Sequence, residues 1–146
     1  MIAQRANSLT LGVADVARAR AYYDRPGWRA SNASQESVTC FEGNGTVLAL
    51  FGRQALAKDV GRLQREHAAA DMPLACNVAS KAEVERIYHH AIACGATALK
   101  SPVDVFWGGY SGYFADPDGH VCEVAHNPFF VPDDQGHLIL PSVSIN

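Results

Sequence analysis

Short apolar runs separated by polar turns fill the first fifty positions of the chain. Residues 8–13, SLTLGV, alternate apolar and polar side chains, which predicts a strand with one buried face. Residues 14–25 carry apolar side chains at helical spacing between an N-cap at Asp15 and a stop at Pro26, which predicts a short helix. Three further short strands are expected, at residues 28–31, 37–41 and 46–51. The order is one strand, one helix and three strands.

The same order of elements returns in the second half of the chain. Residues 74–78 predict a strand, and Ser80 with Glu83 forms the capping box of a helix that extends to about Cys94. Two more strands are expected at residues 96–100 and before the turn Asp116-Pro117-Asp118-Gly119, with a loop at residues 102–107, and a last strand follows that turn. The chain is therefore interpreted as a duplicated βαβββ module.

A length of 146 residues suits a single domain. Its expected parts are the first module at about 7–52, a linking helix at about 54–70, the second module at about 73–127 and a C-terminal tail at 128–146. The alternative for the linking segment is a flap over a pocket, and the tail contains a turn followed by a possible extra strand.

Composition narrows the choice of partners. The chain is 48% hydrophobic and 18% charged, with a net charge of −3 and no long run of one sign, which describes a globular protein and argues against nucleic acid or an anionic membrane as partner. A small neutral or mixed-charge ligand is expected instead. The sequence has neither a membrane-length apolar run nor a signal-peptide pattern, and its four cysteines form no CxxC pair. A cytoplasmic protein with free thiols is therefore expected.

Two stretches carry a family resemblance. LGVADVARARAYYDRPGW near the start and GYFADPDGHVCEVAHNP near the end, in two βαβββ modules, resemble the vicinal oxygen chelate superfamily. This superfamily includes glyoxalase I, extradiol dioxygenases, fosfomycin-resistance enzymes and bleomycin-binding proteins. The resemblance covers nearly the whole chain and implies an α+β fold, with two βαβββ modules forming a curved mixed β-sheet around a cavity and the helices outside. It also suggests a homodimer.

The resemblance also indicates where a metal would bind. Enzymes of this superfamily hold a divalent metal through side chains, often His and Glu, on the first and fourth strands of each module. The register places these positions at Ser8, Ala49, Pro73 and Glu123. Only Glu123 is a strong ligand, and one carboxylate falls short of the three protein ligands that a catalytic zinc or facial-triad iron site needs. We therefore expect no cofactor and disfavour a divalent metal, which Glu123 would bind if one were present.

Side-chain alternation predicts the lining of the cavity. If Glu123 points inward and Asp116 pairs with Gly119 across the turn, Tyr110 and Phe114 face the cavity as well. Trp107, beside two glycines, is expected to close the rim. The candidate ligand contacts are Phe51, Asn77, Trp107, Tyr110, Phe114 and Glu123. For each aromatic residue the alternative is packing in the core.

The expected function follows from this mostly apolar lining. The first interpretation is a glyoxalase-like or bleomycin-resistance-like protein that binds a small organic molecule in an apolar cavity without the family metal. The alternative is a lyase or dioxygenase-type enzyme in which Glu123 is the catalytic acid/base or a metal ligand. A third possibility is a purely structural dimer module with a filled cavity. Whether the protein is an enzyme stays open at this point.

Overall fold

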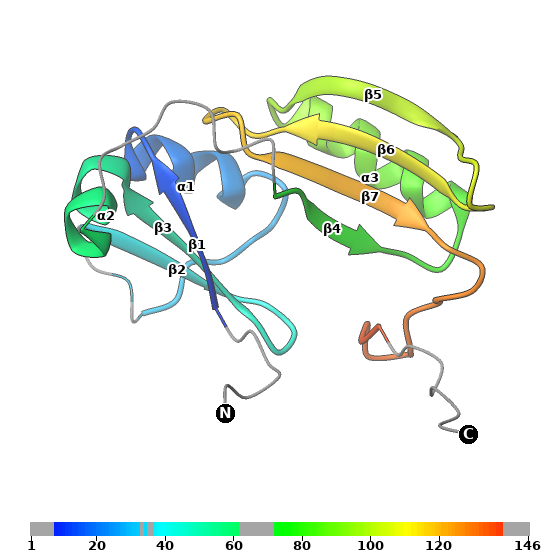
Figure 1. Ribbon diagram of the computed structural model, residues 1–146, viewed down its shortest axis with the longest axis horizontal. Helices are drawn as coiled ribbons and strands as arrows, with labels where there is room; N and C mark the ends of the chain where they lie inside the picture. The colour runs from blue at the N-terminus through cyan, green and yellow to red at the C-terminus, as the bar shows by residue number, and fades with distance from the viewer. Residues whose placement is uncertain (1–7, 33, 35–36, 62–71, 139–146) are drawn as a thin grey trace. The chain divides into compact units, whose positions relative to one another are not determined.

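The computed structural model describes residues 8–32, 34, 37–61 and 72–138 (Figure 1). The chain divides into two compact units, Met1–Ala68 and Ala69–Asn146, and each is described by itself. Both units are α+β, and each contains a mixed sheet of its own. Among the described residues, no helix is long and apolar enough to cross a membrane.

The first unit follows the predicted order with one strand fewer. Its elements are β1 (Ser8–Val13), α1 (Val16–Asp24), β2 (Val38–Glu42), β3 (Val47–Gly52) and α2 (Arg53–Val60). The strand order is β1-β3-β2, with β1 parallel and β2 antiparallel to the central β3. The prediction of a strand at residues 28–31 was wrong, because this segment makes only an isolated bridge between Ala30 and Phe41. The Trp28 amide instead donates to the Tyr23 carbonyl, at 3.2 Å, and ties this segment to the end of α1.

Helix α1 packs on one face of the first sheet. Its N-cap is Asp15, as predicted, with Oδ1 accepting from the Arg18 amide at 2.9 Å. Tyr22 and Tyr23 are buried on the sheet side of the helix, and the rings of Tyr23 and Phe41 lie 5.8 Å apart. Phe41 is fully buried, so the aromatic residues of α1 and β2 form the core between helix and sheet.

The second unit is a full βαβββ module, as predicted. Its elements are β4 (Leu74–Asn77), α3 (Lys81–Ala93), β5 (Thr97–Asp104), β6 (Tyr110–Ala115) and β7 (Val121–His126). The strand order is β4-β7-β6-β5, with β4 parallel to β7 and the other pairs antiparallel. The loop expected at residues 102–107 begins later, because β5 continues to Asp104. Pro102 is tolerated there because β5 is an edge strand with an irregular register.

Helix α3 covers one face of the second sheet (Figure 1). Ser80 caps it by accepting from the Glu83 amide at 3.2 Å, and Glu83 accepts from the Ala79 amide at 2.9 Å. The reciprocal bond of the predicted capping box therefore reaches one residue before the cap. Val84 and Val124 are fully buried where helix and sheet meet.

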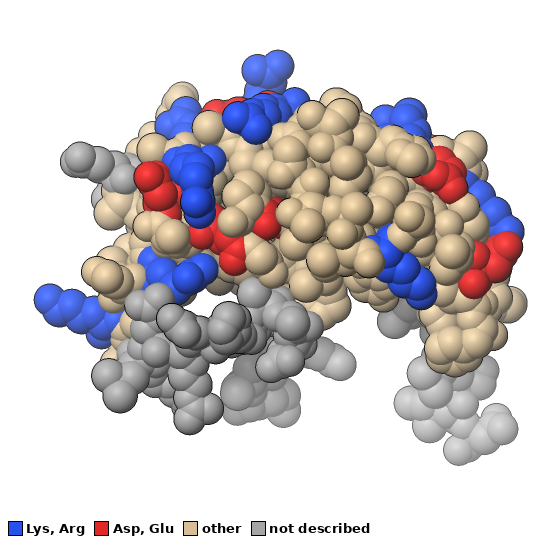
Figure 2. Space-filling model, turned by 90° about the horizontal axis from the view of Figure 1, so that it is seen from above, with Lys and Arg blue, Asp and Glu red and all other residues tan. Residues whose placement is uncertain are grey.

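The linking segment and the tail are described in part. Helix α2 covers the first part of the linking helix predicted at about residues 54–70 and ends at Val60, where Gly61 caps it in a left-handed conformation, with φ of 73°. Residues 62–71 lie outside the described part of the chain. In the tail, the turn around Asp133 is present, no strand is found up to residue 138, and residues 139–146 lie outside the described residues. On the face shown in Figure 2, basic and acidic side chains of the described residues are interspersed.

Candidate functional site

The turn between β6 and β7 sets the register of the candidate site. The Asp116 amide donates to the His120 carbonyl at 3.0 Å, so Asp116 pairs with His120 across the turn and not with Gly119. The Asp116 carboxylate is buried and accepts from the amides of Asp118 and His120, both at 2.9 Å. Gly119 adopts φ of 87°, which favours glycine. The turn therefore contains one residue more than the sequence suggested.

This extra residue moves two predicted ligand contacts to the other face of the sheet. Phe114 pairs with Cys122 and Tyr110 pairs with His126, and both aromatic side chains pack against the buried cluster under α3. The Tyr110 hydroxyl donates to Glu85 of that helix. The prediction that Tyr110 and Phe114 share a face with Glu123 was therefore wrong, because a shift of one residue reverses every side chain of a strand.

Glu123 instead pairs with Tyr113, which the sequence analysis missed. The two residues are directly opposite on β7 and β6, and the Tyr113 hydroxyl donates to Glu123 Oε1 at 2.8 Å. Burial raises the pKa of Tyr113, and the hydrogen bond to Glu123 and the negative charge of Glu123 raise it further. Tyr113 thus stays protonated at neutral pH and holds one oxygen of Glu123 in place.

Apart from Lys100, which pairs with Tyr113, the face around this pair is built from small side chains. Ala75 of β4 pairs with Glu123, and Asn77 pairs with Ala125, so Asn77 shares the face of Glu123 as predicted. Cys122 and Val124 point to the α3 face, also as predicted. The rows on either side of the pair consist of Thr97, Val103, Ser111, Ala115, Val121, Ala125 and Asn77. Tyr113, Glu123 and Lys100 are therefore the larger polar groups among small neighbours.

Trp107 lies in the turn between β5 and β6. A Cβ atom on Gly109 would come within 1.6 Å of the Trp107 ring, so the indole lies directly over this glycine. Phe106, next to it, is fully exposed at 101% of its reference area. The predicted role of Trp107 at a cavity rim stays a prediction.

Phe51 belongs to the first unit. It pairs with Gly12 of β1 and Val38 of β2, and it lies on the sheet face opposite to the one that packs on α1. Its side chain is half-buried. The structure thus brings Glu123 and Asn77 together on one face, places Tyr110 and Phe114 on the other face of the same sheet, and places Phe51 in the other unit.

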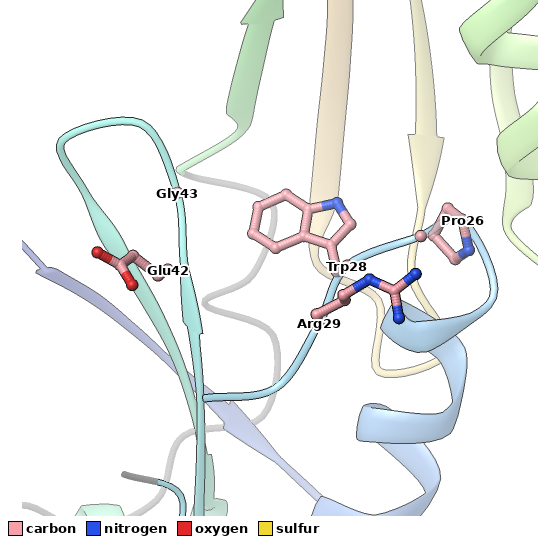
Figure 3. A pocket seen from close by; sticks show the side chains of 6 residues that line it. Pro26, Trp28, Arg29, Glu42 and Gly43 are labelled. Carbon is pink, nitrogen blue, oxygen red and sulfur yellow. The ribbon is translucent and has the colours of Figure 1, made fainter. Parts of the chain in front are cut away.

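A surface hollow lies beside Trp28 in the first unit (Figure 3). Its volume is about 470 Å³, and its lining residues are Pro26, Gly27, Trp28, Arg29, Glu42 and Gly43. Trp28 is 41% exposed, and its ring meets the rings of Tyr23 and Phe41 edge-on, with centroids 6.0 and 5.9 Å away. Trp28 therefore packs against the aromatic core. The hollow lies between the segment that follows α1 and the end of β2.

The residues at the family's metal positions do not match a metal site. Ser8 and Ala49 lie on the strands β1 and β3, and Pro73 precedes β4, so only Glu123 contributes a carboxylate. Tyr113 already binds one of its oxygens. Within the described ranges, no group of three or more His, Cys, Asp or Glu side chains is arranged to hold a metal ion. We derive no chemistry through a metal.

Comparison with known proteins identifies the family. The model of the Glyoxalase/Bleomycin resistance protein/Dioxygenase superfamily matches residues 5–124. The chain belongs to this superfamily. The match spans both units and confirms the resemblance to the superfamily, although the first unit has one strand fewer than the predicted module.

Solved structures of the superfamily have the same fold. A glyoxalase-related enzyme from Fulvimarina pelagi is 30% identical, with a TM-score of 0.86 over 96% of this chain and 100% of that chain. A glyoxalase/bleomycin resistance protein/dioxygenase from Nocardioides is 24% identical, with a TM-score of 0.74 over 86% and 85% of the two chains. Lactoylglutathione lyase from Agrobacterium tumefaciens is 22% identical, with a TM-score of 0.67 over 86% and 96%. No curated protein matches the chain.

Proposed function

We propose that this superfamily member binds a small organic molecule in an apolar cavity to which the Glu123 face of the second sheet contributes. The observation that carries the proposal is the hydrogen bond from Tyr113 to Glu123 at 2.8 Å, on a face whose neighbouring side chains, apart from Lys100, are small. Ligand sites typically combine apolar walls with a few fixed polar groups. Tyr113 and Glu123 provide such a fixed polar group.

The carboxylate of Glu123 retains binding capacity. Tyr113 binds Oε1, and Oε2 accepts no hydrogen bond from any described residue. A carboxylate oxygen accepts more than one hydrogen bond, and a partly buried one gains from each donor that replaces lost water. Glu123 is thus suited to anchor a hydrogen-bond donor of a ligand, without the family metal.

The second candidate is an enzyme that uses Glu123 as an acid/base or as a metal ligand in a lyase or dioxygenase-type reaction. The relative from Fulvimarina pelagi, at 30% identity, is described as a glyoxalase-related enzyme. A carboxylate held by a neutral phenol also has the fixed position that proton transfer requires. The two candidates make different predictions for metal content and for Glu123→Gln.

Metal content separates the candidates first. Protein purified without an affinity tag is examined by elemental analysis and then titrated with zinc, nickel, manganese and iron(II) while thermal stability is followed. Absence of metal and of any shift supports the metal-free binder. Near-stoichiometric metal or a saturable shift contradicts it. Glu123→Gln then changes the ligand affinity of a binder, whereas an enzyme loses rate by about a hundredfold or more.

The assembly and location are part of the same proposal. We expect a cytoplasmic homodimer without nucleic acid as partner, supported by the net charge of −3 and by four cysteines that are all free. Light scattering after size-exclusion chromatography gives the mass of the particle. A mass of one chain contradicts the homodimer.

A further inference from the structure

One row of side chains crosses the second sheet from edge to edge. The strand registers pair Ala75 with Glu123, Glu123 with Tyr113, and Tyr113 with Lys100. Directly paired residues of neighbouring strands point to the same face of a sheet. The row therefore presents a methyl group, a carboxylate, a phenol and an ammonium group in that order, on the face opposite to α3.

Strand β5 is distorted on both sides of Lys100. Its register with β6 shifts between Ala98 and Lys100 and again between Lys100 and Val103, while Lys100 itself stays paired with Tyr113. In the second irregular stretch, Pro102 packs so closely on β6 that a Cβ atom on Gly112 would lie 2.9 Å from its ring. Bulges re-aim side chains and are common beside binding sites. Between the two register shifts, Lys100 thus keeps its direct pairing with Tyr113.

Opposite charges stand at two points of the row and are not paired with each other. The backbones of Lys100 and Glu123 are two strand spacings apart, or about 10 Å. Neither side chain forms an ion pair with any described residue. Tyr113 lies between them and turns its hydroxyl toward Glu123. The row therefore carries a positive and a negative group two strand positions apart, with the side chain of Tyr113 between them.

We propose that this row selects small zwitterions, with a protonated amine at Glu123, an anionic group at Lys100 and an apolar spacer of about one ring over Tyr113. The inference rests on the proposed function, which it refines by giving the ligand class. The amine donates to the second oxygen of Glu123, and the anion is attracted by the Lys100 ammonium. A ligand with both groups at this spacing gains from both contacts at once.

Four probes that share one benzene ring and differ in their charged groups test the proposal. They are 4-(aminomethyl)benzoate with both charges, benzylamine with the positive charge, benzoate with the negative charge, and neutral benzyl alcohol. Their dissociation constants for the full chain are measured by ligand titration in heteronuclear NMR at low ionic strength. We expect the zwitterion to bind at least about tenfold more tightly than either singly charged probe, the ratio given by about 1.4 kcal/mol.

Variants assign each contact. Lys100→Met is expected to reduce the affinity of the zwitterion to that of benzylamine and to leave benzylamine unchanged. Glu123→Gln is expected to have the mirror effect, reducing the zwitterion to the level of benzoate. Lys81→Met is the matched control, because Lys81 lies on α3 and pairs with Asp104 at 2.6 Å on the exposed surface. Unchanged thermal melting and NMR dispersion confirm that each variant is folded.

The possible results separate this inference from the proposed function. If benzyl alcohol binds as well as the charged probes, or if Lys100→Met weakens benzylamine and benzoate equally, the zwitterion proposal is overturned while small-molecule binding stands. If none of the four probes binds but other apolar molecules do, the ligand class is wrong and the proposed function stands. If no small molecule binds at all, both proposals fail.

Discussion

The imidazole Nδ1 of His120 lies 2.9 Å from Oδ2 of Asp116, inside the turn that joins β6 and β7. A second turn in the tail has the same construction, with Asp133 Oδ2 3.3 Å from Nδ1 of His137. Each aspartate also accepts the amides two and four residues later. The two turns differ in burial, since the Asp116 side chain is 1% exposed and the Asp133 side chain 34% exposed.

Because the two turns have the same hydrogen bonds, they allow a test of how burial changes the stability that the aspartate contributes. Asp116→Ala leaves two amides without their acceptor inside the folded unit, so the free energy of unfolding is expected to fall by about 2–4 kcal/mol. Asp133→Ala is the matched control and is expected to cost less than about 1 kcal/mol, because water replaces the carboxylate. Urea unfolding of both variants measures the difference. Equal losses would contradict the role assigned to burial.

The exposed turn is expected to respond to acid. The hydrogen bond from the His137 amide lowers the pKa of Asp133 below its usual 3.8, with further lowering by the Gln135 amide and the His137 ring. A carboxyl group with a lowered pKa stabilises the fold above its unfolded pKa and loses this effect as the pH falls through the folded value. Local order of the turn is therefore expected to decrease below about pH 4.

Carboxyl ¹³C NMR gives the pKa of Asp133 directly. His137→Ala keeps the backbone amide that contributes most and removes only the ring, so most of the lowering is expected to persist in this variant. A return of the pKa to its usual value in His137→Ala would show that the ring, and not the amide, is the main cause.

Cys122 is expected to be the least reactive thiol of the second unit. Burial raises the pKa of Cys122 to about 12, and the negative charge of Asp116 and the neighbouring Cys76 add to this. Thiolate is the reactive form, so at pH 8 the fraction available for alkylation is about a thousandfold below that of an ordinary cysteine. Iodoacetamide labelling of the folded protein, read by mass spectrometry, checks this. Labelling of Cys122 as fast as in urea would contradict it.

Gly109→Ala is expected to move Trp107 without unfolding the sheet. The added Cβ atom would lie 1.6 Å from the ring, which must leave its place over the backbone. Because a side chain and not the backbone gives way, the expected loss of stability is about 1 kcal/mol or less. Tryptophan fluorescence in a Trp28→Phe background reports the change at Trp107. Gly52→Ala, with open space around the added atom and a φ of −53° that alanine also adopts, controls for the substitution itself. An unchanged spectrum would show that the ring is not held at Gly109.

Local chemistry was readable from the sequence wherever a short motif determined it. The bounds of β1, the Asp15 cap of α1 and the Ser80 cap of α3 were predicted because each depends on a few neighbouring residues. The hairpin register was missed by one residue, since DPDG suggested a four-residue turn, whereas the Asp116 side chain extends it to His120. The sequence DPDGH does contain the relevant signal, because an aspartate side chain can accept backbone amides of the residues that follow it and so lengthen a turn.

The candidate site was predicted only in part for the same reason. Glu123 and Asn77 were assigned to the correct relative face because the parallel pairing of β4 and β7 has no tight turn to misjudge. Tyr113 was missed because the register error placed its neighbours Gly112 and Phe114 beside Glu123. The extension of β5 through Pro102 depends on pairing with β6, which the local sequence does not contain.

The irregular strand β5 also affects how the molecule resists aggregation. An exposed edge invites a strand of another molecule, and a long regular edge allows open-ended stacking. Here Pro102 lacks the amide that such stacking needs, and the two register shifts leave no long run of evenly spaced donors along the edge. The distortion that positions Lys100 thus also protects this side of the second sheet from uncontrolled polymerisation. The other edge strand of that sheet, the short β4, has a regular register, so it is the edge on which another strand could pair.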